Sequence, residues 1–329
     1  MNSAILLVDA ALATRDSWKS FLQSHQYDVF TAEDGEFALR ECLELRPDLV
    51  LLHDTLPDID GFELCRRIKG NPLNLQIPIV LIKPSSNPGD EARSREAGAA
   101  DFWGSCGSLA EALSRVQSLL RLKTYIDEQA KSVLLSLARS IEAKSPLMSG
   151  HSDRIVKYAL ELGISLDLSD EELRDLRVAC LLHDIGKVSV PDEILLKPGP
   201  LNIEETEIVR RHAVIGENIC APLKSLRRIL PAIRHHHERM DGSGYPDGLS
   251  GHEIPLMARI LQIADIYDAL ITDRPYREAL SSERALETLN QEAGYGWLDA
   301  SLVWKFSRIC RLGDYFPVRG RTMLASYYA

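Results

Sequence analysis

The 329-residue chain contains 45% hydrophobic residues, so it can bury more than one core, and its length favours two domains. A net charge of −10 argues against a broad cationic surface for long nucleic acid, so a nucleotide ligand would be small. Six cysteines without a CxxC pair argue against a disulfide framework, and no apolar run approaches the roughly 18 residues of a membrane span. We therefore expect a cytoplasmic protein that does not enter a membrane.

Short apolar segments alternate with helical patterns up to about Arg121. The predicted strands are Ala4–Val8, Asp28–Thr31, Leu49–Leu52, Ile77–Ile82 and Asp101–Trp103. Such alternation is typical of a parallel sheet covered by helices. Residues 1–121 are therefore predicted to form an α/β domain.

A helix-compatible stretch runs from Leu109 to about Lys144 without an internal Gly or Pro. It predicts a rigid helix between two domains, of which residues 122–145 form a linker that continues into the second domain. Two helices broken between Lys123 and Glu128 are the alternative. After Pro146, helical segments are separated by Gly- and Pro-rich turns, so residues 146–329 are predicted to be all-α.

The N-terminal domain resembles the receiver domains of response regulators, which have a flavodoxin-like α/β fold. The segments that carry the resemblance are Ile5–Asp9, Pro47–Leu52 and Leu56–Glu63. In that family an aspartate that accepts a phosphoryl group ends the third strand, where this chain has His53. The acidic partner expected after Asp9 is Ala10, while Lys83 and Ser105 replace the hydroxyl residue and the lysine that end the fourth and fifth strands.

These replacements predict a degenerate receiver. Phosphoryl transfer needs a carboxylate on Mg²⁺, and with Asp9 alone neither the metal site nor the acceptor can assemble. Asp54 adjoins His53, but the alternation of side chains along a strand is expected to point it to the other face. We expect the domain to serve docking or dimerisation.

Histidines and acidic residues gather in the second half of the chain, where seven of the nine histidines follow residue 150. The strongest pattern is His183-Asp184, three residues before Lys187, in an apolar segment predicted to be helical. Adjacent side chains on a helix diverge by about 100°, so both can flank one metal site while Lys187 stays on the same face. An isolated His–Asp pair is weak evidence, but it is joined here by His151, His212, His236, His237 and Asp265.

The order of these residues, followed by Asp241-Gly242-Ser243-Gly244-Tyr245-Pro246, resembles the HD-GYP branch of the HD phosphohydrolase superfamily. The resemblance covers about residues 131–312. It implies the metal ligands His151, His183, Asp184, His212, His236, His237 and Asp265. His235 is interpreted as a neighbour of the site and His252 as a solvated side chain.

The implied ligand set suits two divalent ions bridged by Asp184. Mixed nitrogen and oxygen ligands without a thiolate favour iron, with manganese as the alternative, over a closed zinc site. Some family members hold a third ion with a glutamate where this chain has Leu147, so two ions are expected. Glu142 matches the family, whereas Ser145 and Met148 depart from it and put full activity in doubt.

A bridged metal pair supplies hydroxide near neutral pH, which predicts phosphodiester hydrolysis. Asp184, Lys187 and Asp268 are the catalytic candidates. Asp268, one helical turn after Asp265, would orient a metal ligand or accept a proton, and its alternative interpretation is a charge on the helix surface. The resemblance places Lys187, Tyr245, Arg274 and Arg277 at the substrate.

The resemblance implies cyclic di-GMP as substrate and pGpG or GMP as product. The alternative function is a catalytically weak or inactive metal-containing cyclic di-GMP binder that acts through protein partners. A third is hydrolysis of another cyclic dinucleotide or of a nucleotide phosphate. Other signalling proteins, and a second copy bound through the linker helix or the receiver, are the candidate protein partners.

Overall fold

The computed structural model describes residues 2–85, 87–104, 108–144, 150–273 and 277–312. The chain divides into two compact units. One contains residues 1–130 and 222–224, and the other contains residues 131–221 and 225–329. Each unit is described by itself.

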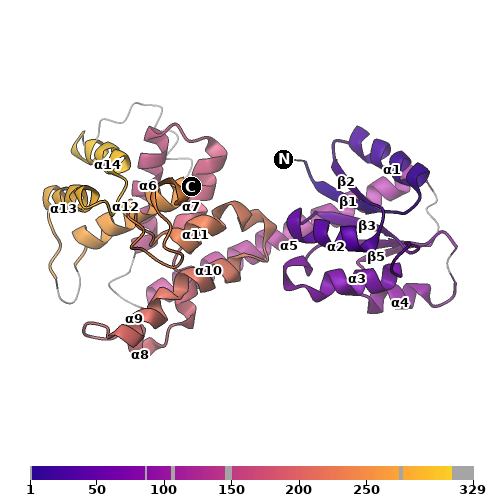
Figure 1. Cartoon of the computed structure of the whole chain (residues 1–329), viewed down its shortest axis with the longest axis horizontal. Helices are drawn as coiled ribbons and strands as arrows, with labels where there is room; N and C mark the ends of the chain where they lie inside the picture. The colour runs from indigo at the N-terminus through magenta and orange to yellow at the C-terminus, as the bar shows by residue number, and fades with distance from the viewer. Residues whose placement is uncertain (1, 86, 105–107, 145–149, 274–276, 313–329) are drawn as a thin grey trace. The chain divides into compact units, whose positions relative to one another are not determined.

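The first unit is built on a five-stranded parallel sheet with the order β2-β1-β3-β4-β5 (Figure 1). The strands are β1 (Ala4–Val8), β2 (Asp28–Ala32), β3 (Leu49–His53), β4 (Ile79–Ile82) and β5 (Asp101–Trp103). The helices that follow them are α1 (Leu12–Ser24), α2 (Gly35–Glu44), α3 (Gly61–Gly70), the 3₁₀ turn η1 (Pro72–Asn74), α4 (Asp90–Glu96) and α5 (Leu109–Ala143). This arrangement confirms the predicted α/β fold.

Alternating side chains of the central strands build a separate core on each face of the sheet. Leu6 and Val8 of β1 pack with Phe62 of α3, whereas Ile5 and Leu7 belong to a second cluster on the opposite face. Because both faces are covered, the central strand β1 is apolar and buried along its whole length. This pattern is the reason why the strands were recognisable in the sequence.

The strand boundaries differ from the prediction by one or two residues. β4 begins at Ile79 and not at Ile77, because the Ile77 amide donates to the Asn74 carbonyl and Pro78 has no amide hydrogen to donate. β3 continues to His53, which pairs with Ile82 of β4, and β2 continues to Ala32. His53 therefore ends a strand at the carboxyl edge of the sheet.

Helix α5 is continuous over 35 residues, so the alternative of two broken helices is wrong. Within the segment where the break was considered, Lys123 Nζ lies 2.7 Å from Asp127 Oδ2, one helical turn further on. This pair is buried, and it joins successive turns of the helix where a break would separate them.

The second unit is all-α in its described residues apart from isolated bridge residues, namely Asp241, Ser250 and Arg277, which confirms the predicted class. Besides the end of α5, its helices are α6 (His151–Ser165), α7 (Asp170–Leu182), α8 (Asp192–Leu195), α9 (Ile203–Arg210), α10 (His212–Cys220), α11 (Leu230–His235), α12 (Leu256–Ile271), α13 (Ser282–Gly294) and α14 (Ala300–Leu312). The 3₁₀ segments are η3 (Ile185–Ser189), η4 (Lys224–Ile229) and η5 (Gly251–Glu253).

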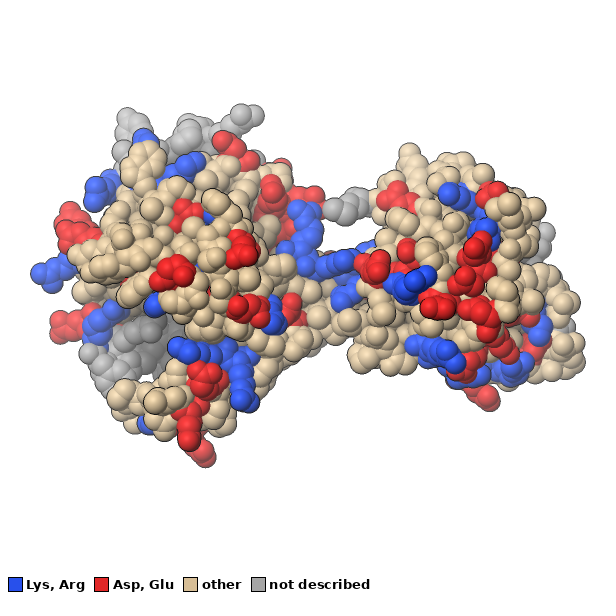
Figure 2. Space-filling view, viewed as in Figure 1, with Lys and Arg blue, Asp and Glu red and all other residues tan. Residues whose placement is uncertain are grey.

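The core of this unit lies where α6, α7, α12, α13 and α14 meet. Ile155 of α6, Leu176 of α7 and Ile263 of α12 are fully buried there, together with Phe306 of α14. Acidic and basic side chains are interspersed over the face of the unit that Figure 2 shows. In the described part of the chain, no helix is long and apolar enough to cross a bilayer.

Candidate metal centre

The seven side chains predicted as metal ligands come together at the ends of several helices. His151 begins α6, His212 begins α10, and His236 and His237 follow α11, while Asp265 lies within α12. Three groups of these side chains each bring their ligand atoms within 4.8 Å of one another. They are His151, His183 and Asp265; His183, Asp184 and His236; and His212, His236 and His237.

Asp184 lies between the two outer groups. Its Oδ2 is 3.3 Å from His183 Nε2, and its Oδ1 is 3.4 Å from His212 Nε2. One carboxylate thus faces both an imidazole of the first group and an imidazole of the third. This is the placement that a bridging ligand requires.

The local structure around two of the ligands differs from the prediction. His183 and Asp184 are not within a helix, since α7 ends at Leu182 and the 3₁₀ turn η3 begins after Asp184. His212 is not inside a continuous helix either, because α9 ends at Arg210 and α10 starts at His212.

A close backbone approach accompanies both breaks. A Cβ atom on Gly186 would lie 1.9 Å from the carbonyl oxygen of His212, so only glycine lets the turn after Asp184 pack on the start of α10. Sequence spacing could not reveal this contact, because the two segments are joined only by the tertiary fold.

Backbone carbonyls fix the orientation of three imidazoles. The Nδ1 atoms of His183, His212 and His236 lie 2.8, 2.6 and 2.7 Å from the carbonyl oxygens three residues earlier, those of Cys180, Val209 and Ile233. A carbonyl only accepts, so each Nδ1 is the donor and Nε2 is the ring nitrogen left free to bind a metal ion. Tautomers fixed in this way are typical of metal-ligating histidines.

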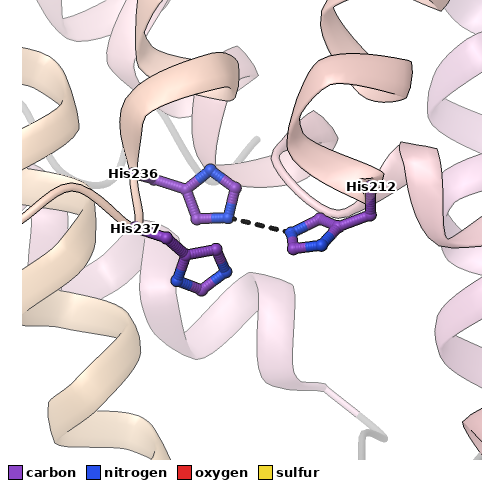
Figure 3. Close-up of side chains that lie close together, drawn as sticks. All are labelled: His212, His236 and His237. Carbon is purple, nitrogen blue, oxygen red and sulfur yellow. Dashed lines mark hydrogen bonds between the residues drawn. The ribbon is translucent and has the colours of Figure 1, made fainter. Parts of the chain in front are cut away.

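The Nε2 atoms point into a shared space where they lack protein donors. Figure 3 shows His212 facing His236 across helices, and their Nε2 atoms are 3.3 Å apart. Among the described residues, buried His183 Nε2 and Asp184 Oδ1 have no hydrogen-bond partner. Buried polar atoms without hydrogen-bond partners are costly, and divalent cations would satisfy them. The residues present therefore fit a metal centre.

Burial and charge set the protonation of this cluster. Burial lowers the pKa of His236 and of His237 well below the ordinary value, and neighbouring histidines lower both further, so these rings are neutral and ready to bind. Burial also lowers the pKa of His183, but Asp184 more than offsets it and the pKa rises to about 9. Burial acts to raise the pKa of Asp184, but His183 and Lys187 hold it well below its usual range.

Asp268 is buried, with only 1% of its surface exposed, so its interpretation as a surface charge is wrong. His151 Nδ1 lies 2.7 Å from its Oδ2, and Arg154 Nε lies 2.6 Å from its Oδ1. Burial raises the pKa of Asp268, but the hydrogen bonds from His151 and Arg154 more than offset it and the pKa stays low. Asp268 thus holds the His151 ring with Nε2 turned toward Asp265, at 3.4 Å.

Sequence reasoning missed Arg154. The sequence did carry a signal for it, because Arg154 lies three residues after His151 on the same helix face, as Asp268 does after Asp265.

We expect Arg154→Gln to weaken metal binding by about tenfold, because Asp268 would lose its guanidinium partner and orient His151 less firmly. The loss should grow as the pH falls, since the pKa of Asp268 would rise and its protonated form would no longer hold the ring. Titration of metal-free protein with Mn²⁺ at two pH values measures both effects.

Arg66→Gln is the control for this substitution, because Arg66 is an exposed helical arginine of the first unit whose pairing is with Glu63. Equal Mn²⁺ affinity in wild type and Arg154→Gln would show that Asp268 positions His151 without the guanidinium.

Glu238 is a second residue that sequence reasoning missed. It is fully buried, and its carboxylate accepts hydrogen bonds from the amides of Asp247, Gly248 and Leu249 at 2.7, 3.1 and 3.1 Å. His235 lies beside it, with Nδ1 3.8 Å from Glu238 Oε1. These contacts fasten the glycine-rich loop that carries Tyr245 against the end of α11.

The candidate substrate residues are only partly described. Lys187 Nζ lies 2.5 Å from Asp184 Oδ2, and the Tyr245 ring stacks on His237 with centroids 4.8 Å apart. Arg277 is exposed and donates to the Ala269 carbonyl at the end of α12. Arg274 lies outside the described residues, as do Ser145, Leu147 and Met148, while Glu142 accepts a hydrogen bond from the Ser152 amide.

At the carboxyl edge of the sheet in the first unit, β3 ends in His53, where an aspartate would be needed to accept a phosphoryl group. Asp9 and His53 line a cavity of about 240 Å³ together with Trp18 and Trp103. Lys83 Nζ is 3.0 Å from Asp90 Oδ2 and 3.7 Å from Asp54 Oδ2. Asp54 does not line that cavity. Ser105 lies outside the described residues.

We expect acetyl phosphate with Mg²⁺ to leave the intact mass of the protein unchanged, because His53 stands where a carboxylate would accept the phosphoryl group. Mass spectrometry checks this result. A stoichiometric gain of one phosphoryl group that Asp54→Asn removes would contradict the prediction.

Comparison with known proteins supports both halves of the sequence interpretation. A family model for the HD domain matches residues 136–302, and one for the response regulator receiver domain matches residues 5–104. The chain is 36% identical over 317 residues to a protein of Xanthomonas campestris named cyclic di-GMP phosphodiesterase response regulator RpfG, covering 88% of this chain and 83% of that protein.

Two relatives from Vibrio cholerae extend the comparison. One, named probable cyclic di-GMP phosphodiesterase, is 34% identical over 82% of this chain and 69% of its own length. Another, named 3'3'-cGAMP-specific phosphodiesterase 3, is 42% identical over 50% of this chain and 36% of its own length. The chain therefore belongs to the family of response regulators in which a receiver domain precedes an HD domain.

Proposed function

We propose that this protein is an HD-GYP-type phosphodiesterase that uses two divalent ions, iron or alternatively manganese, to hydrolyse cyclic di-GMP to pGpG or GMP. The observation that carries the proposal is the set of buried imidazoles whose Nδ1 atoms are held by fixed acceptors. Their Nε2 atoms lie in overlapping groups that include Asp184 and Asp265. The names of the full-length relatives support the same activity.

When bound, a pair of divalent ions would supply hydroxide near neutral pH and polarise the phosphoryl group. The ligands would be His151, His183, Asp184, His212, His236, His237 and Asp265. Asp184 would hold the two ions at the separation they need to act together. Both carboxylate oxygens of Asp268 are engaged by His151 and Arg154, so its role is to position a ligand and not to accept a proton.

Lys187, Tyr245, Arg274 and Arg277 are the proposed substrate contacts. The Lys187 ammonium, now paired with Asp184, can neutralise a non-bridging phosphate oxygen beside the metal ligands. Tyr245 offers its ring next to His237, and the Arg210 guanidinium lies 5.1 Å from the centroid of that ring. Arg210 was not predicted from the sequence, and it adds a cation on this side of the loop.

A second candidate substrate is 3'3'-cGAMP, because a relative named for it matches the HD half of the chain. The two substrates are compared at equal concentration with metal-loaded protein, and products are separated by chromatography. We expect cyclic di-GMP to be hydrolysed at least ~10-fold faster, equivalent to about 1.4 kcal/mol of transition-state preference. A reversed preference would assign the site to 3'3'-cGAMP, whereas tight cyclic di-GMP binding without product would favour the binder interpretation.

We also propose that residues 1–121 form the receiver, residues 122–145 the linker and residues 146–329 the HD-GYP domain. Helix α5 is proposed to pair two copies of the chain. Leu122, Ile126, Val133 and Leu137 are exposed by 54, 45, 66 and 37%, and their spacing of four and seven residues follows one helix face. We expect light scattering to report a dimer that Ile126→Glu/Val133→Glu dissociates. A wild-type monomer at all concentrations would contradict pairing.

A further inference from the structure

A cationic cavity lies apart from the metal centre, between the C-terminal half of α5 and the helices α6 and α7. Its volume is about 410 Å³, and all its lining residues belong to the second unit. Four of them are cations, namely Lys131 and Arg139 of α5 and Arg174 and Arg177 of α7. Three serines and three aliphatic side chains complete the lining, and none of the described lining residues is a carboxylate.

The three arginines of this cavity have no carboxylate at ion-pair distance among the described residues. Within the part of the chain that the structure describes, Arg139, Arg174 and Arg177 form no ion pair. Two acidic residues on the same helix as Arg174 and Arg177 are used elsewhere, because Glu171 and Asp175 both pair with Arg228, at 2.5 and 2.9 Å. A protein with a net charge of −10 thus gathers cations in one cavity, and three of them are arginines without an ion pair among the described residues.

The lining combines two kinds of contact. Guanidinium groups form forked, charge-assisted hydrogen bonds with phosphate oxygens. Leu135, Val178 and Leu181 offer an apolar wall that an aromatic base can cover. Cavities of about 300–1,000 Å³ hold compact organic ligands, and this volume is at the lower end of that range.

We propose that this cavity is a second ligand site that binds a mononucleotide, with its phosphate on Arg139, Arg174 and Arg177 and its base against the aliphatic wall. None of the proposed metal ligands lines the cavity, so the site does not depend on the proposed function. The site would nevertheless be linked to the metal centre, because α6 begins at His151 and α7 leads into His183. A bound nucleotide would clamp α5 to both helices.

The test is calorimetric titration of the full-length, metal-loaded protein with GMP, guanosine and inorganic phosphate. We expect GMP to bind, and Arg139→Gln/Arg177→Gln to weaken its binding at least tenfold. The matched control, Arg66→Gln/Arg67→Gln, removes two exposed helical arginines of the first unit and should leave the affinity unchanged. Guanosine should bind at least tenfold more weakly than GMP.

The Asp184→Asn variant distinguishes GMP binding in the cavity from GMP binding at the metal centre. We expect this variant to bind GMP as tightly as the wild type. Loss of GMP binding in Asp184→Asn with retention in Arg139→Gln/Arg177→Gln would place the nucleotide at the metal centre and overturn the proposal. Inorganic phosphate that binds as tightly as GMP would overturn the nucleotide assignment. Cyclic di-GMP hydrolysis is measured in parallel, and its failure with GMP binding intact would count against the proposed function alone.

Discussion

Replacing Asp184 with alanine should lower the metal content below two ions per chain and reduce hydrolysis of cyclic di-GMP by ~100-fold or more. Asp184 is the carboxylate that faces both His183 and His212, at 3.3 and 3.4 Å. Without it, the group with His151 and the group with His212 would share no ligand, and no described carboxylate would hold two ions at a fixed separation. Elemental analysis and product chromatography measure the two losses.

The control is Glu287→Ala, which removes an exposed carboxylate on α13 and should leave two ions bound. Circular dichroism of Asp184→Ala should show an unchanged fold, because the apolar cluster around Ile155 and Ile263 packs without the ions. Two ions retained in Asp184→Ala would refute its bridging role. Three tightly held ions in the wild type would show that Leu147 does not exclude a third.

Gly186→Ala should destabilise the second unit by about 3 kcal/mol and should also lower its metal content. A Cβ at this position would lie 1.9 Å from the His212 carbonyl oxygen and 2.6 Å from the Gly216 amide nitrogen, so α10 would have to move. Because His212 begins that helix, the movement would carry one proposed ligand away from Asp184. Thermal unfolding and elemental analysis of the same preparation test both effects.

Gly294→Ala is the matched control, since a Cβ there meets nothing within 4 Å and alanine has the higher helix propensity. It should leave the melting temperature unchanged or raise it. A Gly186→Ala protein with the stability and metal content of the wild type would show that the backbone contact with α10 can relax.

The fold was predictable where one physical pattern dominates. Strands buried on both faces read as continuous apolar runs, and a helix without Gly or Pro reads as continuous over α5. The start of β4 was not predictable from hydrophobicity, because a single hydrogen bond from the Ile77 amide to Asn74 takes that residue out of the strand. Boundaries of this kind depend on local donors and not on the pattern.

The candidate ligands were predictable because their residue types and order are unusual, and the structure brings all seven together. The groups that orient these ligands through hydrogen bonds were harder to predict. The carbonyls that hold His183, His212 and His236 belong to the backbone and leave no mark in the sequence. Arg154 acts on Asp268 from 114 residues away, so its partner becomes visible only in the fold.

The central claim is that the second, helical unit holds a two-metal centre that hydrolyses a phosphodiester. Its most direct test is incubation of anaerobically purified iron- or manganese-loaded protein with cyclic di-GMP, followed by chromatography of the products, before and after chelation. We predict linear pGpG or GMP from the loaded protein, no product after chelation, and recovery when the metal is restored. Cyclic di-GMP recovered intact from protein that carries two ions per chain would contradict the account.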